Sequence, residues 1–285
     1  MTEKILYNCS EIEQLMQTGR VCLVDVRDSD DYLTGHIPGA VNLPEIFYRL
    51  CSTLGSGLSD LQTYFSELFS KAGIRMDQTL VFYEDKLNTR YGGSCRGYFI
   101  SCYLGHPDSG VLEGGLSQWL DEGHAISVEA VKPEKSNFVP QVNASIMASR
   151  DDVLQALRDR TAKLLDSRDE IEWMGESSSP YGKDFVPRKG RLSGAVWIEW
   201  YEFLRDLDKP VALFKSPQEI RELCASHSLY PEDNIIIYCF KGARASNTYI
   251  ALKIAGFSHI RNYFGSWNEW ARDERLPIDD RVLLA

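Results

Sequence analysis

The sequence predicts an α/β protein built from two similar domains, each a mainly parallel sheet with helices on both faces. Short apolar segments alternate with stretches in which apolar residues recur at helical spacing, which is typical of strands joined by helices. The same landmarks also occur twice along the chain in the same order. A polar stretch with two prolines separates the copies and is typical of a linker. We therefore expect domains over residues 1–127 and 148–285, joined by a linker over residues 128–147.

The internal duplication rests on paired segments. They are VCLVDVRD (21–28) and KLLDSRD (163–169), GHIPGAVNLP (35–44) and GRLSGAVWIEW (190–200), TLVFYED (79–85) and NIIIYCF (234–240), and GGLSQW (114–119) and GSWNEW (265–270). A capping box precedes the first segment of each copy, at Ser10 to Glu13 and at Ser149 to Asp152, and predicts the start of a helix there.

Composition and charge exclude several classes of protein. The chain of 285 residues is 44% hydrophobic and 25% charged, so it can bury a core, and it carries a net charge of −10. Nucleic acids and anionic membranes bind positive surfaces, so neither is an expected partner. The amino-terminal segment lacks the apolar run of a secretory signal. Seven cysteines without Cys-x-x-Cys spacing indicate reduced thiols in the cytoplasm, with no metal site and no cofactor.

A cysteine stands at a predicted strand-to-helix turn of the second copy. Residues 234–238 form a short apolar strand, and residues 245–256 show a helical pattern that Gly256 would close. Cys239 follows the carboxyl end of the strand, which is where ligands bind to parallel sheets. At such a turn, backbone N–H groups and the positive end of the helix dipole can converge on the sulfur and favour its thiolate.

The residues after Cys239 support this interpretation. Gly242 permits the backbone angles of a tight turn, while Lys241 and Arg244 supply positive charge in an acidic chain. A thiolate and an anion site in one loop predict covalent chemistry on an oxyanion. A cysteine that ends a strand is more often a packing residue, and for the other six cysteines we prefer a structural role. These are Cys9, Cys22, Cys51, Cys95, Cys102 and Cys224.

Taken together, these features resemble the two-domain rhodanese family, the thiosulfate and 3-mercaptopyruvate sulfurtransferases. The resemblance covers about residues 5–280 and rests on the tandem halves and on three motifs. The motifs are DVRDSDDYLTGHIPGAVNLP (25–44), CFKGAR (239–244) and GSWNEWARDERLPI (265–278). It implies that the second domain carries the active cysteine and that the first domain is a catalytically silent copy.

The silent copy is expected to lack a nucleophile. Tyr83 aligns with Tyr238, so either Glu84 or Asp85 takes the place of Cys239. A carboxylate cannot carry sulfane sulfur, and the first domain is therefore expected to contribute packing and a wall of the site.

The resemblance also implies a mechanism. The Cys239 thiolate would attack the outer sulfur of a small anionic donor, release sulfite and keep the sulfur as a persulfide, which the loop amides would stabilise. Cyanide or a thiol, with a thioredoxin-like protein as a candidate, would then accept the sulfur. Arg168 would reach the sulfonate of the donor, and a structural pair with Asp166 is an equally weighted alternative. The implied substrate-binding residues are Arg168, Phe240, Lys241, Gly242, Ala243 and Arg244.

The loop favours thiosulfate over 3-mercaptopyruvate, which stays the alternative donor. Mercaptopyruvate enzymes typically carry Cys-Gly-Ser-Gly-Val-Thr, and their serine is thought to work with an aspartate and a histidine of the first domain. This sequence keeps those two as Asp25 and His36 but has Lys241 at the serine position, which suits a dianionic donor. His36 itself is better explained as a residue that stabilises a turn. Arg244 at the last loop position resembles some bacterial thiosulfate sulfurtransferases.

Two other function classes stay open. A phosphatase of the same fold would need a longer spacing than the four residues between Cys239 and Arg244. A non-enzymatic partner-binding module, or a relay that hands persulfide sulfur to another protein, is the second class, although the Cys-x-x-Gly-x-Arg loop argues against a purely structural role. The basic segment PRKGR (187–191) could line the donor entrance, but we prefer a solvated surface.

Overall fold

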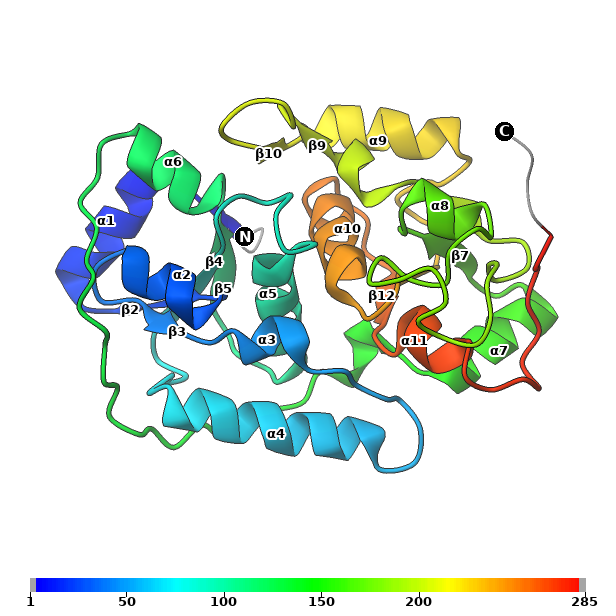
Figure 1. Cartoon of the computed structure of the whole chain (residues 1–285), viewed down its shortest axis with the longest axis horizontal. Coiled ribbons are helices and arrows are strands. Elements are labelled where there is room, and N and C mark those ends of the chain that lie inside the picture. Colours follow the sequence, from blue (N-terminus) through cyan, green and yellow to red (C-terminus); the bar gives the residue numbers. More distant parts are fainter. Residues whose placement is uncertain (1–3, 282–285) are drawn as a thin grey trace. The chain divides into compact units, whose positions relative to one another are not determined.

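The computed structural model describes residues 4–281, which separate into two compact units (Figure 1). The first unit comprises the described chain up to Arg49, Ser59–Ala144 and Leu204–Phe214, and the second comprises Leu50–Leu58, Ser145–Phe203 and the described chain from Lys215. Each unit therefore contains one short segment from the other half of the sequence. The expected domain boundaries at residues 127 and 148 stay a prediction.

The first unit is built on a five-stranded parallel sheet. Its strands, in spatial order, are β1 (Leu6–Tyr7), β5 (Ser109–Leu112), β4 (Thr79–Tyr83), β2 (Val21–Asp25) and β3 (Val41–Asn42). Every residue of the central strand β4 is buried, as expected for a strand covered on both faces. The helices of this half are α1 (Cys9–Thr18), α2 (Ser29–Thr34), α3 (Glu45–Tyr48), α4 (Gly57–Lys71), α5 (Gly93–Tyr103) and α6 (Gly115–Asp121) (Figure 1).

The second unit repeats this arrangement. Its parallel strands, in spatial order, are β6 (Met147–Ala148), β12 (Ile260–Tyr263), β11 (Ile235–Tyr238), β7 (Lys163–Asp166) and β8 (Val196–Trp197). The helices are α7 (Arg150–Asp159), α8 (Glu170–Trp173), α9 (Pro217–Ser226), α10 (Ala243–Ile254) and α11 (Ser266–Trp270), with 3₁₀ turns at Ala144–Ile146 and Trp200–Phe203. The predicted α/β class with two parallel sheets flanked by helices is confirmed.

A short antiparallel hairpin lies outside these two sheets, as do two isolated antiparallel bridges, His36 with Ser127 and Arg191 with Asp279. The hairpin pairs β9 (Leu204–Arg205) with β10 (Leu213–Phe214) and belongs to the first unit, although it lies in the second half of the sequence.

Two predicted helix starts differ from the observed ones. The first helix begins at Cys9, because the Asn8 side chain accepts from the Glu11 N–H and forms the capping box two residues before the predicted one. The helix after Cys239 begins at Ala243, two residues earlier than its apolar pattern indicated, with Gly242 as its N-cap. The capping box of Ser149 with Asp152 is confirmed.

Strand register fixes the equivalence of the two copies. Tyr83 pairs with Asp25 across β4 and β2, and Tyr238 pairs with Asp166 across β11 and β7. Each tyrosine hydroxyl accepts a backbone N–H at 3.1 Å, in the first case from Ile37 and in the second from Leu192. The residue after Tyr83, Glu84, therefore takes the place of Cys239.

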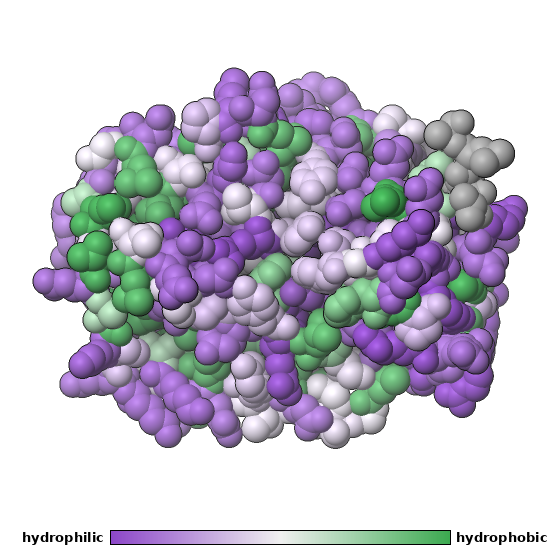
Figure 2. All heavy atoms as spheres, in the orientation of Figure 1, coloured by the Kyte–Doolittle hydropathy of each residue, from purple (hydrophilic) through white to green (hydrophobic). Residues whose placement is uncertain are grey.

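Among the described residues, no helix combines the length and the apolar character needed to cross a bilayer. On the face seen in Figure 2, hydrophilic residues predominate and apolar residues form separate patches.

Candidate active site

Cys239 lies in the short turn between β11 and α10. Its sulfur accepts a hydrogen bond from the Gly242 backbone N–H at 3.1 Å, so an amide of the turn is aimed at it. Its own N–H donates to Ser266 Oγ at 3.1 Å, and that hydroxyl lies 4.0 Å from the sulfur. The Cys239 residue is only 1% exposed, but these polar partners distinguish its surroundings from an apolar interior.

Gly242 closes this turn in a conformation that favours glycine. Its φ is 87°, and a Cβ on it would lie 2.6 Å from the Phe264 ring. Its carbonyl accepts from the Ser246 hydroxyl at 2.6 Å and from Asn262 Nδ2 at 3.3 Å. These two hydrogen bonds fix the position of Gly242 and therefore of its N–H, which faces the sulfur.

Aromatic side chains surround Phe240 and Lys241, the two residues of the turn between Cys239 and Gly242. The Phe240 ring packs edge-on against Tyr181 and Phe185, at centroid distances of 5.5 and 5.7 Å. The Lys241 ammonium lies 4.9 Å from the Tyr181 ring centroid, within the range of a cation–π contact. The loop's lysine charge is thus kept beside partly exposed aromatic residues, while Ala243 is buried as the first residue of α10.

Arg244 is held by acidic residues of the same unit. Its guanidinium is almost fully buried and pairs with Glu172 at 2.5 Å and with Asp169 at 2.7 Å. Burial opposes the charge, yet Glu172 and Asp169 raise the Arg244 pKa well above its usual value, and the charge of Cys239 adds to that effect. Most of the Arg244 charge is therefore balanced within the fold. Neither carboxylate was identified from the sequence, where only the spacing of Asp169 and Glu172 at the start of a helix was available as a signal.

Arg168 takes part in a structural pair that the first unit repeats. It is fully buried and donates to Asp166 at 2.6 Å and to the Gly190 carbonyl at 2.8 Å. Arg27 makes the same contacts with Asp25 and with the Gly35 carbonyl, both at 2.7 Å. The pairing alternative is thus observed. Within the described part of the chain, Arg168 Nη1 has no hydrogen-bond acceptor, so a donor contact at this nitrogen stays a prediction.

His36 and the PRKGR segment both have structural contacts. His36 is fully buried, stacks on Tyr32 at 3.7 Å and has backbone carbonyls at both ring nitrogens, in line with a role in the turn. The preferred solvated surface for PRKGR is wrong. Arg188 donates to four backbone carbonyls of the carboxyl-terminal segment, and Arg191 is 3% exposed and pairs with Asp279. Carbonyls that no helix or strand satisfies attract these arginines out of water.

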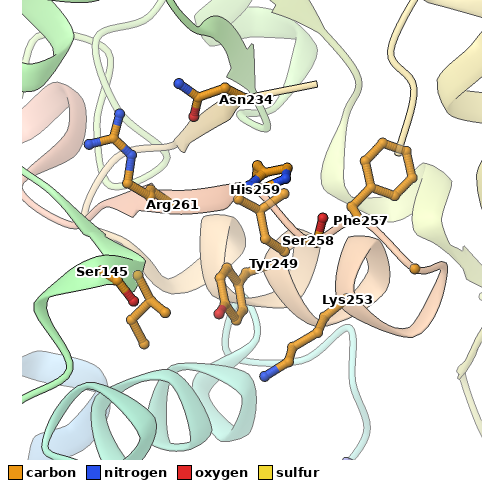
Figure 3. Close-up of a pocket in the computed structure, with 11 residues that line it drawn as sticks. Ser145, Asn234, Tyr249, Lys253, Phe257, Ser258, His259 and Arg261 are labelled. Carbon is orange, nitrogen blue, oxygen red and sulfur yellow. The ribbon is translucent and has the colours of Figure 1, made fainter. Parts of the chain in front are cut away.

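A cavity of the second unit lies away from Cys239. It has a volume of about 870 Å³ and is lined by residues such as Asn234, Lys253 and His259 (Figure 3). Asn234 and His259 precede β11 and β12, so this cavity lies at the amino ends of strands whose carboxyl ends lead to Cys239. Parallel sheets place reactive groups at the carboxyl ends, so the turn is the better candidate.

Comparison with known families decides the relationship. The model of the rhodanese-like domain matches the chain twice, over residues 8–122 and 149–273. The chain belongs to the rhodanese family. Both copies of this rhodanese therefore carry the family fold, and the second match contains the turn of Cys239.

Similar proteins of known name support a sulfurtransferase activity. The sulfur carrier protein TtuD of Thermus thermophilus is 29% identical over 284 residues, which cover 96% of each chain. The thiosulfate sulfurtransferase of Corynebacterium glutamicum is 32% identical over 258 residues, or 88% of this rhodanese and 82% of that protein. The thiosulfate sulfurtransferase of Rattus norvegicus is 28% identical over 255 residues, or 88% and 82%.

A protein with a similar fold has been solved with a persulfide on one of its cysteines. EanB, in a variant with a cysteine persulfide captured in a tetrahedral intermediate state with ergothioneine, matches with a TM-score of 0.77 at 26% identity. The match covers 92% of this rhodanese but 65% of the EanB chain, so the solved protein is considerably longer.

Proposed function

We propose that this rhodanese is a thiosulfate sulfurtransferase that carries sulfur as a persulfide on Cys239. The proposal depends on one observation, the Gly242 N–H directed at the Cys239 sulfur from the amino-terminal turn of α10. Such an amide, together with the positive end of a helix, stabilises negative charge on that sulfur and on a second sulfur bound to it.

In the first half-reaction, the Cys239 thiolate attacks the outer sulfur of thiosulfate. A Cys239–sulfur bond forms while the sulfur–sulfur bond of thiosulfate breaks, and sulfite leaves with the electron pair of that bond. The total charge does not change, because one thiolate becomes one persulfide anion and one dianion becomes another. No proton has to move, which agrees with a site that has Lys241 where a serine would serve a proton relay.

In the second half-reaction, an acceptor removes the outer sulfur. Cyanide attacks it, the persulfide bond breaks, and thiocyanate leaves while Cys239 returns to the thiolate. A thiol acceptor would take the sulfur in the same way. The donor reacts with the free thiolate form of the enzyme and the acceptor with the persulfide form, so ping-pong kinetics are expected.

Support for thiosulfate over 3-mercaptopyruvate comes from Lys241. The Lys241 residue is only 6% exposed, but its ammonium lies beside the exposed ring of Tyr181, where a dianionic donor that reaches the turn would gain from its charge. The names of the similar proteins of Corynebacterium glutamicum and Rattus norvegicus point to the same donor.

The test compares the two donors with purified protein and cyanide as acceptor. Sulfite release from thiosulfate and pyruvate release from 3-mercaptopyruvate give kcat/KM for each donor. We expect thiosulfate to be preferred, Cys239→Ser to be inactive with both, and Cys224→Ser to keep the wild-type rate as a matched control, since Cys224 is another buried cysteine of the second unit. A preference for 3-mercaptopyruvate would contradict the proposal that thiosulfate is the donor. If wild type and Cys239→Ser are equally inactive with both donors, the proposal that the protein is a sulfurtransferase is contradicted.

A sulfur relay to a protein acceptor is the second candidate, favoured by the similarity over 96% of the chain to a protein named as a sulfur carrier. In this case the persulfide on Cys239 forms from the donor, but cyanide and small thiols accept the sulfur slowly. Mass spectrometry of the peptide that contains Cys239 would show one added sulfur, and a thioredoxin-like protein should remove it faster than a small thiol at equal concentration.

A further inference from the structure

Three potential metal ligands from separate parts of the first unit meet at the amino-terminal end of α1. Cys9 is the first residue of α1, and Glu122 and His124 follow α6. Their ligating atoms all lie within 4.8 Å of one another. The Cys9 side chain is buried, whereas 14% of the His124 side chain and 38% of the Glu122 side chain are exposed. The cluster is therefore anchored in the core and open to solvent on one side.

Neighbouring side chains already orient these groups. Glu13 lies four residues after Cys9, on the same face of α1, and its carboxylate lies 2.9 Å from His124 Nδ1. The other ring nitrogen, Nε2, faces Glu122 at 3.2 Å. Gln118 donates to the second oxygen of Glu122 at 2.5 Å. A carboxylate behind a histidine and a hydrogen bond to a ligating carboxylate are the usual outer contacts of a metal site.

The charges of this cluster favour a cation. The carboxylates of Glu13 and Glu122 both face His124, and the Cys9 sulfur lies within 4.8 Å of the ligating atoms of Glu122 and His124. Two carboxylates and a thiol thus surround a single imidazole. A divalent ion held by a thiolate, a carboxylate and a neutral imidazole would bring the net charge of its ligand set to zero.

The second unit has permanent cations at the matching place. Arg150 is the first residue of α7, as Cys9 is of α1. Its Nη1 lies 3.4 Å from Asp273, which follows α11 and also pairs with Arg275 at 2.8 Å. The Arg150 guanidinium group therefore ties the helix start to the turn in the second unit, and the Arg275 guanidinium group lies on that turn. In the first unit, a thiol and an imidazole stand at this junction, and both are metal ligands.

We propose that Cys9, Glu122 and His124 bind a zinc ion, or a divalent ion of similar softness, with water as the fourth ligand. One sulfur, one nitrogen and one oxygen ligand form a donor set that suits zinc, with one position left for solvent. On binding, the S–H bond of Cys9 breaks, its proton goes to solvent and a sulfur–metal bond forms without a change in oxidation state. The ion ties α1 to the segment after α6. The site lies in a different unit from Cys239 and does not depend on the proposed sulfur transfer.

The test is a Co²⁺ titration of the untagged full-length protein, because Co²⁺ replaces zinc and reports its ligands in its absorption spectrum. The Cys239→Ser variant is used as the parent, so that the turn thiol cannot contribute. We expect a thiolate-to-cobalt charge-transfer band and the ligand-field bands of a four-coordinate ion, and both should disappear on addition of zinc. Adding Cys9→Ser should abolish the charge-transfer band, whereas adding Cys224→Ser should leave it unchanged.

Variants at the exposed ligands make the test independent of the buried cysteine. His124→Gln and Glu122→Gln should each weaken zinc binding by at least a hundredfold, and Glu13→Gln by roughly tenfold to a hundredfold, as for other outer contacts. Circular dichroism shows whether each variant is folded. A folded parent that gives no charge-transfer band, a band that survives Cys9→Ser, or zinc affinity unaffected by His124→Gln and Glu122→Gln would each overturn the proposal.

Discussion

The strand-to-helix turns of the two units begin at equivalent residues but differ in length. The Glu84 carbonyl accepts from the Leu116 N–H at 2.9 Å, and the Cys239 carbonyl accepts from the Trp267 N–H at 3.0 Å, so the two residues occupy equivalent positions. The first turn runs on to Gly92 before its helix begins, whereas the second reaches the equivalent Gly242 after two intervening residues.

The side chain of Glu84 fills the longer turn of the first unit. The Glu84 carboxyl group accepts from the backbone N–H of Ser94 at 2.9 Å and from its hydroxyl at 2.6 Å, at the amino-terminal end of α5. Burial raises the Glu84 pKa to about 8. In the second unit the shorter cysteine stands at this position, and a transferred sulfur would extend it toward the helix as the carboxyl group of Glu84 does. The comparison supports the expectation that the first copy is silent, because the Glu84 side chain fills the place that a transferred sulfur would take.

Substitutions at Cys239 and Glu84 should have the largest effect. Cys239→Ser removes the proposed nucleophile, so thiosulfate-dependent sulfite release should fall by roughly a thousandfold or more. The double variant Cys239→Ser with Glu84→Cys should stay inactive, because the longer first turn does not direct an amide at a short side chain as Gly242 does. Recovery of measurable turnover in the double variant would show that the side chain alone, and not the length of the turn, silences the first unit.

The paired arginines give the next largest effect. Arg27→Met and Arg168→Met each leave a buried aspartate without its partner, which should lower the free energy of unfolding by about 3–5 kcal/mol. Urea unfolding followed by fluorescence and circular dichroism measures both losses. If the two arginines are purely structural, the losses should be similar.

Kinetics separate a structural role from a donor contact at Arg168. Arg168→Lys and Arg27→Lys keep a charge but lose the forked geometry on the aspartate. A selective rise in KM for thiosulfate in Arg168→Lys, with kcat unchanged, would support the predicted contact at Nη1. An equal and small change of KM in both variants would contradict the predicted contact between Arg168 Nη1 and the donor.

Much of this fold could be predicted because buried parallel strands and helix caps leave local patterns. The strand before Cys239, the Gly256 that follows α10 and the cap at Ser149 depend on a few adjacent residues. The partners of the site could not be predicted in the same way. Glu172 pairs with Arg244 across 72 positions of sequence, and one chain has no signal for such a long-range ion pair.

The same limit explains the wrong interpretation of PRKGR and the late identification of Glu84. Arg188 is drawn to carbonyls more than 80 positions away, which the charge of the segment does not reveal. The choice between Glu84 and Asp85 required the strand register around Tyr83 and Tyr238, and the backbone hydrogen bonds that Glu84 and Cys239 accept from α6 and α11 agree with it. Local chemistry was enough to predict Cys239 as the nucleophile, which stays a prediction, whereas the contacts around it became visible only in the tertiary structure.

The glycine that closes the reactive turn should be sensitive in a way that other glycines are not. Gly242→Ala places a Cβ 2.6 Å from the Phe264 ring at a φ of 87°, and the combined strain should cost about 1–3 kcal/mol and shift the amide that faces Cys239. Gly256→Ala is the matched control, since its φ is 92° but no atom lies within 4 Å. Sulfite release should fall at least tenfold in the first variant and change little in the second. Equal loss of activity in both would mean that the backbone angle matters and the contact with Phe264 does not.

A last prediction concerns the pH dependence that Glu84 gives to stability. Its pKa is raised from 4.5 to about 8 in the folded chain, so between these values the folded state keeps a proton that the unfolded state has lost. The free energy of unfolding should therefore decrease as pH rises through this interval, by up to about 1.4 kcal/mol per pH unit. Glu84→Gln keeps the uncharged shape and should flatten the dependence, while Glu134→Gln at an exposed position should not. Urea midpoints at a series of pH values measure the slope. If wild type and Glu84→Gln show the same slope, then Glu84 is ionised in the fold and the first turn holds an anion of its own.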